Sequence, residues 1–287
     1  MYDARTLTHA LGGKWHSNYG LAFCPAHRNT ATPALAIGTG REGQLLLKCH
    51  AGCDFATVTA ALRDRGLSEH DGSPKRDYKA EQAADDHKRT LQAQQVARET
   101  IPIVGTIAEA YLRGRGITCP LPEDALRFHP SCWHSSGKHL PAIVARVVGS
   151  DGFSVHRTYL RADGSGKTNA EPTKSMLGPC AGGAVRLIEA DGALVVCEGI
   201  ETGLSLASGL LQRPATIWAA MSASGMGNLR LPTTPARLTI ATDGDDAGRA
   251  AAHKLADRAH KLGWAVSFLH APDGKDWNDV LCEKDKK

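Results

Sequence analysis

The stretch from Leu194 to Asp279 contains three acidic motifs, and each of the first two follows a short apolar run. The first motif is Leu194-Val195-Val196-Cys197-Glu198-Gly199. The second is Leu238-Thr239-Ile240-Ala241-Thr242-Asp243-Gly244-Asp245-Asp246-Ala247-Gly248-Arg249. The third is Gly274-Lys275-Asp276-Trp277-Asn278-Asp279. Short apolar runs that end at Gly and Asp are typical of buried strands in a parallel sheet, so this stretch decides the fold.

The segments between the motifs have the pattern of helices, which we expect over 201–211, near 225–229 and over 247–262. In the last segment an apolar stripe is formed by Ala251, Leu255, Ala259 and Leu262. Alternating strands and helices imply right-handed crossovers, with helices on both faces of the sheet. Ligands bind beyond the carboxyl ends of the strands in such sheets. We therefore predict that Glu198, Asp243 and Asp245 converge at one edge.

Clustered carboxylates repel one another, so this acidic edge requires a cation. Oxygen ligands of this kind favour Mg²⁺ or Mn²⁺, and we predict that Glu198, Asp243 and Asp245 bind it. Such an ion can activate an attacking oxygen and stabilise a leaving one in phosphoryl transfer. A single Asp-x-Asp would suit a turn that caps the next helix equally well. Three acidic motifs beside strand ends favour the metal site.

The three motifs together resemble those of the Toprim domain, which bacterial-type primases, type IA and II topoisomerases and some nucleases share. The resemblance covers roughly residues 190 to 282. Within it, Glu-Gly-Ile-Glu-Thr-Gly-Leu-Ser at 198–205 and Gly-Lys-Asp-Trp-Asn-Asp-Val-Leu at 274–281 most resemble phage and plasmid primases. The resemblance implies an α/β Toprim fold for residues 190–287, a parallel-rich sheet with helices on both faces, and a catalytic role.

Length and composition limit the possible classes of protein. The 287 residues suffice for about two domains, and a hydrophobic fraction of 42% allows a packed core. The net charge of +4 is compatible with nucleic acid without indicating it. The chain has no apolar run long enough to span a membrane and does not start with a signal segment, so we expect a cytoplasmic protein. Eight cysteines then point to metal ligands or free thiols.

Four potential zinc ligands lie in residues 1–67, as Cys24-x-x-His27 and Cys49-x-x-x-Cys53. Two ligand-bearing turns separated by a hairpin describe a zinc ribbon, and strands are expected at 34–37 and 44–48. The second spacing is one residue longer than usual, and His50 is a rival ligand. Zn²⁺ would supply folding energy to so small a lobe. The pattern around Cys24 resembles the primase-type zinc ribbon, closed by a helix over 54–66.

Residues 68–100 differ in composition from both neighbours. The polar stretch 68–76 is a predicted linker, and 77–99 is a predicted solvated helix that acts as a spacer or binds a partner. Residues 101–189 have an α+β pattern, with a helix over 106–115 and strands over 142–148, 153–160 and 185–188. Gly164-Ser165-Gly166-Lys167-Thr168 imitates a phosphate-binding loop, but Arg161 replaces a required glycine and Pro172 prevents the helix that must follow. We interpret it as a hairpin tip.

Two basic residues precede the acidic stretch. A strand with Arg157, then Lys174-x-x-Leu177, then the first acidic motif resembles the N-terminal part of the bacterial primase core. The resemblance implies that Arg157 and Lys174 face a template–primer groove, where phosphate contacts would position a strand without reading its sequence. The alternative is that both are ordinary surface cations.

The combined resemblance implies a DNA primase with single-stranded DNA as template and nucleoside triphosphates as substrates. Asp243 and Asp245 would hold the metal, Asp276 and Asp279 would ligate metals or orient waters, and Glu198 would act as ligand or general base. Arg249 and Lys275 would screen triphosphate charge. We expect a phage or plasmid setting, a separate replicative helicase and no membrane contact. The alternatives are a metal-dependent nuclease and a non-catalytic zinc-ribbon accessory.

Overall fold

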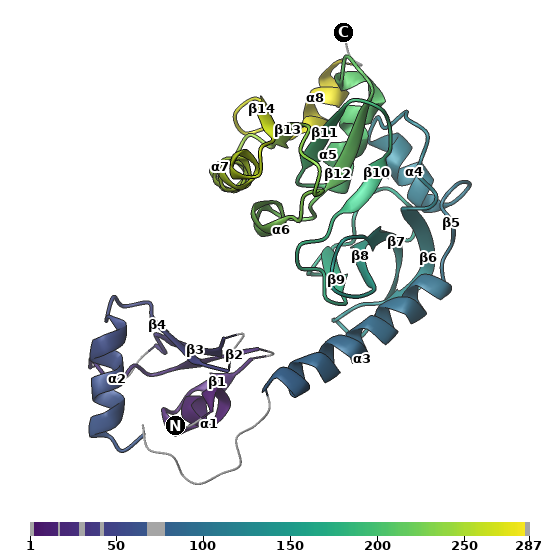
Figure 1. Ribbon diagram of the computed structural model, residues 1–287. Coiled ribbons are helices and arrows are strands. Elements are labelled where there is room, and N and C mark those ends of the chain that lie inside the picture. Colours follow the sequence, from purple (N-terminus) through teal and green to yellow (C-terminus); the bar gives the residue numbers. More distant parts are fainter. Residues whose placement is uncertain (1–2, 17, 29–31, 41–42, 68–77, 285–287) are drawn as a thin grey trace. The chain divides into compact units, whose positions relative to one another are not determined.

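The computed structural model describes residues 3–16, 18–28, 32–40, 43–67 and 78–284. It divides into two compact units, Met1–Asp85 and Asp86–Lys287, shown in Figure 1 from purple to yellow along the chain. The predicted linker at 68–76 lies outside the described residues.

The first unit is a four-stranded antiparallel sheet with two helices. Its strands, in the order β1-β2-β3-β4, are β1 (Lys14–Trp15), β2 (Tyr19–Ala22), β3 (Leu35–Thr39) and β4 (Leu45–Cys49). The predicted hairpin is β3–β4, with Leu35 opposite Cys49. The helices α1 (Ala4–Ala10) and α2 (Phe55–Asp64) begin at aspartates that accept a backbone N–H, as good N-caps do. Leu7, Ile37 and Val58 belong to the small core between them.

The helix α3 (Tyr78–Arg98) matches the helix predicted over 77–99. In the part that belongs to the second unit, Ala93 is fully buried, and Val96 and Ala97 are partly buried beside it. They pack against Val144 and Val155 of the adjoining sheet. The C-terminal part of α3, which we expected to be solvated, is therefore packed on the sheet through these apolar side chains.

The second unit begins with a five-stranded antiparallel sheet in the order β5-β6-β7-β8-β9. The strands are β5 (Ile101–Pro102), β6 (Leu126–Trp133), β7 (His139–Val147), β8 (Ser154–Tyr159) and β9 (Lys174–Leu177), and α4 (Ile107–Gly114) follows β5. The sequence predicted α4, β7 and β8. It did not predict β6, whose pairing with β7 is irregular between His129 and Cys132, on either side of Pro130, or the short strand β9.

A second five-stranded sheet, in the order β10-β12-β11-β13-β14, follows. Its strands are β10 (Val185–Ile188), β11 (Ala193–Cys197), β12 (Ala215–Ala219), β13 (Arg237–Thr242) and β14 (Ala265–His270). All pairs are parallel except β10–β12. The helices are α5 (Ile200–Ser205), which continues as η1 (Leu206–Leu210), α6 (Ala223–Asn228), α7 (Asp246–Lys261) and α8 (Trp277–Lys284).

The central strand β11 shows that helices cover both faces of this sheet. Leu194 and Val196 pack with residues of α6 and α7, whereas Val195 and Cys197 pack with residues of α5 and α8. The expectation of helices on both faces is therefore confirmed, and Figure 1 shows the two helix layers. The predicted stripe of α7 is correct for Leu255 and Ala259, but Leu262 is 55% exposed because the helix has ended before it.

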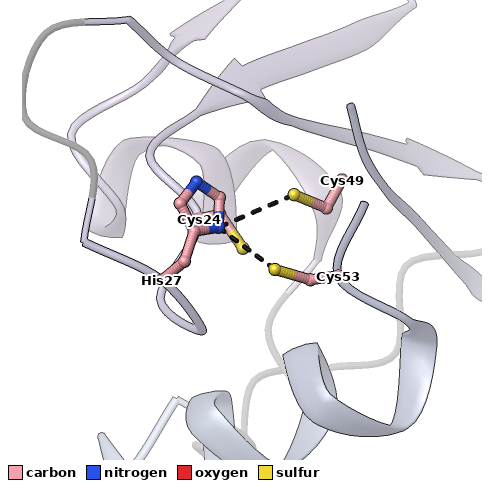
Figure 2. A group of neighbouring side chains, drawn as sticks. All are labelled: Cys24, His27, Cys49 and Cys53. Atoms are coloured by element: carbon pink, nitrogen blue, oxygen red, sulfur yellow. Dashed lines mark hydrogen bonds between the residues drawn. The ribbon is translucent and has the colours of Figure 1, made fainter. Parts of the chain in front are cut away.

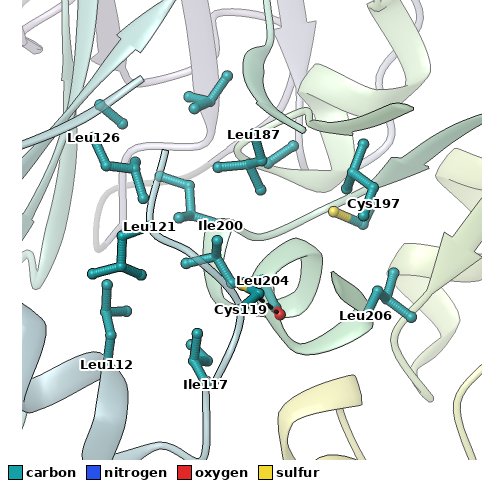
Figure 3. Packing of buried hydrophobic residues seen from close by; sticks show 14 of the residues in the cluster. Leu112, Ile117, Cys119, Leu121, Leu126, Leu187, Cys197, Ile200, Leu204 and Leu206 are labelled. Carbon is teal, nitrogen blue, oxygen red and sulfur yellow. Dashed lines mark hydrogen bonds between the residues drawn. The ribbon is translucent and has the colours of Figure 1, made fainter. Parts of the chain in front are cut away.

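One hydrophobic core joins the two sheets of the second unit. Leu112 of α4 and Leu126 of β6 belong to the same cluster as Ile200 and Leu204 of α5, and Figure 3 shows these side chains facing one another. The antiparallel sheet is therefore fixed against the helix that follows the first acidic motif. None of the helices in the described part of the chain is both long and apolar enough to cross a membrane.

Candidate active site and metal centre

Glu198 and Asp243 follow the ends of two strands that are hydrogen-bonded neighbours. In the parallel pair β11–β13, Cys197 lies opposite Ala241. Glu198 is the residue after Cys197, and Asp243 is the residue after Thr242, which ends β13. Because both strands run in the same direction, the two carboxylates emerge at the same edge of the sheet.

The Asp243-Gly244-Asp245 turn is held against the loop before α8. The N–H of Gly244 donates to the carbonyl of Lys275 at 2.8 Å, and the N–H of Gly274 donates to the carbonyl of Gly244 at 2.9 Å. A Cβ at Gly244 would lie 2.1 Å from the carbonyl oxygen of Pro272, so the close approach requires glycine. Asp245 Oδ1 accepts from the N–H of Gly248 at 2.7 Å, so Asp245 also caps α7.

The third motif contains a reciprocal cap of its own. Asp276 Oδ1 accepts from the N–H of Asp279 at 2.8 Å, and Asp279 Oδ2 accepts from the N–H of Asp276 at 3.1 Å. These bonds satisfy backbone donors at the start of α8. Asp279 is exposed, whereas Asp276 is close enough to Asp243 for their charges to interact.

Two residues of this motif that we had not singled out hold α8 in place. Trp277 Nε1 donates to the carbonyl of Thr242 at 3.0 Å. Asn278 is 1% exposed, and its Nδ2 donates to the carbonyl of Arg115 at 2.7 Å and to Ser205 Oγ at 2.9 Å. The only sequence clue was their position between two acids in a motif that begins a helix.

The acidic residues repel one another electrostatically. Burial, followed by the charges of Glu198 and Asp276, raises the pKa of Asp243 to about 6, and a hydrogen bond of 3.4 Å from Thr202 Oγ1 opposes this shift. Burial and the charge of Asp245 also raise the pKa of Glu198. Such shifts are expected where partly desolvated carboxylates lie close to one another. A divalent cation would reverse both effects.

Lys174 lies on the side of the antiparallel sheet that faces α5. It is the first residue of β9, opposite Thr158 in register, and it is exposed. Lys174 lines the same small cavity as Gly199 and Glu201. Its charge lowers the pKa of Glu201 and opposes the rise in the pKa of Glu198. Lys174 is therefore placed beside the acidic edge.

Arg157 lies on the opposite face of β8 and is only 6% exposed. Its Nη1 donates to the carbonyl of Trp133 at 3.3 Å, and its guanidinium lies 5.6 Å from the centre of the Tyr159 ring. The expectation that Arg157 shares an open groove with Lys174 is therefore corrected. Alternation along the strand sends neighbouring side chains to opposite faces, and the Arg157 face is packed.

Arg249 and Lys275 are engaged in ion pairs at the surface. Arg249 contacts Asp246 at 2.9 Å and Asp273 at 3.1 Å, and Lys275 contacts Glu283 at 2.7 Å. Exposed ion pairs of this kind contribute little to stability. A phosphate group could therefore replace the acid partners at little cost, and a role in binding triphosphate stays a prediction.

Glu201 and Lys167 form a contact that the sequence did not predict. Lys167 Nζ lies 2.6 Å from Glu201 Oε2, and Tyr111 donates a short hydrogen bond to Glu201 Oε1. Lys167 belongs to the segment that we interpreted as a hairpin tip, and a bridge between Leu160 and Lys167 closes that turn. The turn therefore places Lys167 against Glu201 in the first turn of α5. Glu201 is three residues after Glu198.

The first unit contains a second candidate metal site, which is separate in sequence. The ligand atoms of Cys24, His27, Cys49 and Cys53 all lie within 4.8 Å of one another, and Figure 2 shows the four side chains pointing inward. His27 Nδ1 is 3.1 Å from Cys53 Sγ and 3.8 Å from Cys49 Sγ. His50, the rival ligand, is exposed and outside this group. Burial and the neighbouring thiols raise the pKa of Cys53 to about 11, so a cation is needed to hold this side chain as a thiolate near neutral pH.

Comparison with known families assigns two segments of the chain. Residues 87–187 match a domain of unknown function, DUF7146. Residues 193–287 match the Toprim domain, and the sheet order and acidic edge agree with that match. This segment is a Toprim domain. The predicted fold class is therefore confirmed, with an α+β region and a Cys₃His cluster before the Toprim domain.

Among solved structures, the chain is similar to several DNA primases. A DNA primase domain from Pseudomonas aeruginosa is 19% identical, with 68% of this chain and 75% of that chain covered and a TM-score of 0.45. The zinc-binding and RNA polymerase domains of Aquifex aeolicus primase are 15% identical, with 98% and 80% covered and a TM-score of 0.46. The primase fragment of the bacteriophage T7 primase-helicase is 12% identical, with 93% and 95% covered and a TM-score of 0.37. These similarities are too distant to transfer an activity, and no curated protein matches the chain.

The acidic edge of the Toprim domain fits a hard divalent cation in its chemistry. Its donors are carboxylate oxygens with partly buried, mutually repelling charges, which is the ligand type that Mg²⁺ and Mn²⁺ prefer. Within the described ranges, however, the Cys₃His group is the one set of His, Cys, Asp and Glu already spaced to hold a single ion. Binding at the acidic edge would therefore draw the oxygens of Glu198, Asp243 and Asp245 closer together.

Proposed function

We propose that this protein is a DNA primase that makes short primers on single-stranded DNA by metal-dependent nucleotidyl transfer. The supporting observation is the convergence of Glu198 and Asp243 at neighbouring strand ends of a Toprim domain, beside the cationic side chain of Lys174. This arrangement combines a cation site with a lysine that can contact phosphate.

In the proposed reaction, Glu198, Asp243 and Asp245 would hold Mg²⁺ or Mn²⁺. The ion supplies charge stabilisation when a primer 3′ hydroxyl attacks the α-phosphorus of a nucleoside triphosphate and pyrophosphate leaves. Asp276 would ligate a metal or orient water, and Asp279 would support it through the reciprocal cap. Glu198 acts as a ligand or as the general base toward the attacking hydroxyl.

Positive groups near this edge would orient the triphosphate. Lys174 is exposed and close enough to affect the pKa of Glu198, so it is the first candidate. Arg249 and Lys275 would exchange their exposed acid partners for phosphate oxygens. The N-terminal end of α7 adds a favourable dipole. These contacts would bind phosphate groups whatever the base sequence of the nucleic acid.

The first unit would bind the template. A groove of about 340 Å³ lies on its sheet, lined by Tyr19, Leu46, Lys48 and Phe55 among other residues. Gly38 lies opposite both Tyr19 and Leu46 in register, so the middle strand leaves space between the two larger side chains. An exposed aromatic side chain and a lysine suit an unstacked base and its phosphate. Zn²⁺ at the Cys₃His cluster would hold this sheet in shape.

The experiment is primer synthesis on mixed-sequence single-stranded DNA, with Mg²⁺ or Mn²⁺ and with ribo- and deoxyribonucleotides supplied separately. The wild-type protein should extend labelled nucleotides into short products. An Asp243→Asn, Asp245→Asn double variant should lose at least about 100-fold in rate and keep its affinity for the template. Asp257→Asn, an exposed aspartate on α7, is the matched control and should retain full rate.

The same reactions separate the alternatives. Toprim metal sites can also serve hydrolysis with water as the nucleophile, so shortened template without new product would identify a nuclease. Template binding with neither product nor cleavage, across all metals and nucleotides, would identify a non-catalytic accessory. We further propose that the protein acts in replication of a phage or plasmid with a separate helicase.

A further inference from the structure

The buried carboxylate of Glu201 has both oxygens occupied. Its side chain is 14% exposed. Oε1 accepts from the hydroxyl of Tyr111 on α4, and Oε2 pairs with Lys167 Nζ at 2.6 Å. The partners come from two different elements of the α+β region, whereas Glu201 lies in the first turn of α5 in the Toprim domain. The contact therefore spans the boundary between the two regions.

Lys174 is the other cation near this carboxylate. Lys174 and Glu201 line one cavity of about 10 Å³, which is room for about one water molecule. His156 also lines this cavity. It is 4% exposed, and its Nδ1 has no hydrogen-bond partner in the described part of the chain. Met221 also lines the cavity and has a positive φ of 69°. The space between Lys174 and Glu201 is therefore small, and most of the side chains around the two charged groups are apolar.

Two carboxylates compete for the charge of Lys174. Its charge favours the ionised form of both Glu198 and Glu201. Glu201 is the more deeply buried of the two, so it gains more from a nearby cation. Lys167 already neutralises Glu201, with Tyr111 on the remaining oxygen. Glu201 therefore does not need the charge of Lys174, whose side chain stays available to the acidic edge.

We propose that Lys167 is a positioning residue, which occupies the Glu201 carboxylate so that Lys174 stays free to face the acidic edge of the Toprim domain. The reason is physical: a buried carboxylate that loses its partner recruits another cation, since leaving it unpaired is costly. Lys174 lines the same cavity on a flexible side chain, so it is the replacement. Without Lys167, Lys174 turns inward and leaves Glu198.

The direct test measures the accessibility of the Lys174 amine by competitive acylation of the full chain and peptide mass spectrometry. Lys167→Met should slow the acylation of Lys174 by at least about threefold, because Glu201 captures the amine. Adding Glu201→Gln should restore the rate to within about twofold of wild type, since a neutral amide has no need of a cation. Lys138→Met, at an exposed turn, should change nothing.

Each outcome is decisive for the proposal. Unchanged acylation of Lys174 in folded Lys167→Met would overturn it, as would a double variant that stays slow. If Lys167→Met does not fold, Lys167→Gln serves instead, because its amide can still donate to Glu201 while lacking the charge. Lys174 acylation should then fall in the same direction, and an unchanged rate would again refute the role of Lys167.

A second measurement, which rests on the proposed primase function, follows nucleotide affinity. Lys167→Met should weaken the apparent affinity for nucleoside triphosphate several-fold in the wild-type background. In a Lys174→Met background it should have no further effect, because the lysine through which it acts is gone. A purely structural Lys167 would weaken affinity equally in both backgrounds. If the wild type makes no primers, the proposed function fails, and the acylation result still decides the role of Lys167.

Discussion

The indole nitrogen of Trp277 donates a hydrogen bond of 3.0 Å to the carbonyl oxygen of Thr242, the last residue of β13. This bond joins the third acidic motif to the strand that carries the second. The Asp276 carboxylate is therefore fixed relative to Asp243, although the two residues are 33 positions apart in the sequence. The spacing of the acidic edge depends on this contact as much as on the strands.

We predict that Trp277→Phe destabilises the second unit by about 1 kcal/mol more than Trp264→Phe, measured by urea unfolding. Both tryptophans are almost fully buried, but Trp264 Nε1 has no hydrogen-bond partner. Trp264→Phe is therefore the matched control, since it removes a similar side chain without removing a bond. Equal losses in the two variants would show that the Thr242 contact contributes nothing.

Gly244→Ala should disrupt the acidic edge. Its Cβ would approach the carbonyl oxygen of Pro272 to 2.1 Å, so the turn must move away from the loop before α8, at a cost of about 1–3 kcal/mol. Affinity for Mn²⁺ should fall together with stability, as titration calorimetry can measure.

The control for this substitution is Gly114→Ala at the end of α4, where no atom lies within 4 Å of the added Cβ. Alanine should leave stability unchanged or raise it by up to about 1 kcal/mol there. Wild-type Mn²⁺ affinity in Gly244→Ala would contradict the role we assign to the close contact with Pro272.

Stability should depend on pH through His156. Burial, followed by the charge of Lys174, lowers the pKa of His156 from 6.5 to about 4 in the folded protein. The unfolded chain binds the proton below pH 6.5 and the folded chain does not. The contribution of His156 to the free energy of unfolding is therefore complete above pH 6.5 and is lost as the pH falls toward 4, by at most about 3 kcal/mol.

The measurement compares unfolding free energies of wild type and His156→Gln at pH 7 and pH 4. The wild type should lose more stability than the variant over this range. His260→Gln, at an exposed position, controls for the substitution itself. Parallel pH profiles for wild type and His156→Gln would show that His156 takes up its proton without unfolding.

The Cys₃His cluster should contain about one zinc ion per chain, as elemental analysis would show. Cys49→Ser should remove the ion and expose the first unit to protease, because its core is small. The second unit should keep its hydrogen-exchange protection, since its core is separate. Cys282→Ser lies outside the cluster and should retain zinc; a folded, protected first unit without metal would refute the structural role.

The sequence alone located the acidic edge and the thiol cluster, because both depend on local patterns. An apolar run that stops at Glu198 or Asp243 marks the end of a buried strand without knowledge of any partner. Ligand pairs such as Cys24 and His27 lie in one turn, so their spacing carries the information. Two strands of the Toprim sheet were not predicted. One is β12, although it is mostly buried, and the other is β14, which is largely exposed and has no continuous apolar run.

Contacts between distant side chains were decided only by the tertiary structure. Glu201 meets Lys167 across 34 positions and Tyr111 across 90, and Asn278 meets Arg115 across 163. The alternation of side chains along β8 and β9 places Arg157 and Lys174 on opposite faces of the sheet, but it does not say which face is covered. The order of the strands and the helix that packs on each face settle that question. Only the folded core determines which polar groups are desolvated and must therefore form hydrogen bonds or ion pairs with one another.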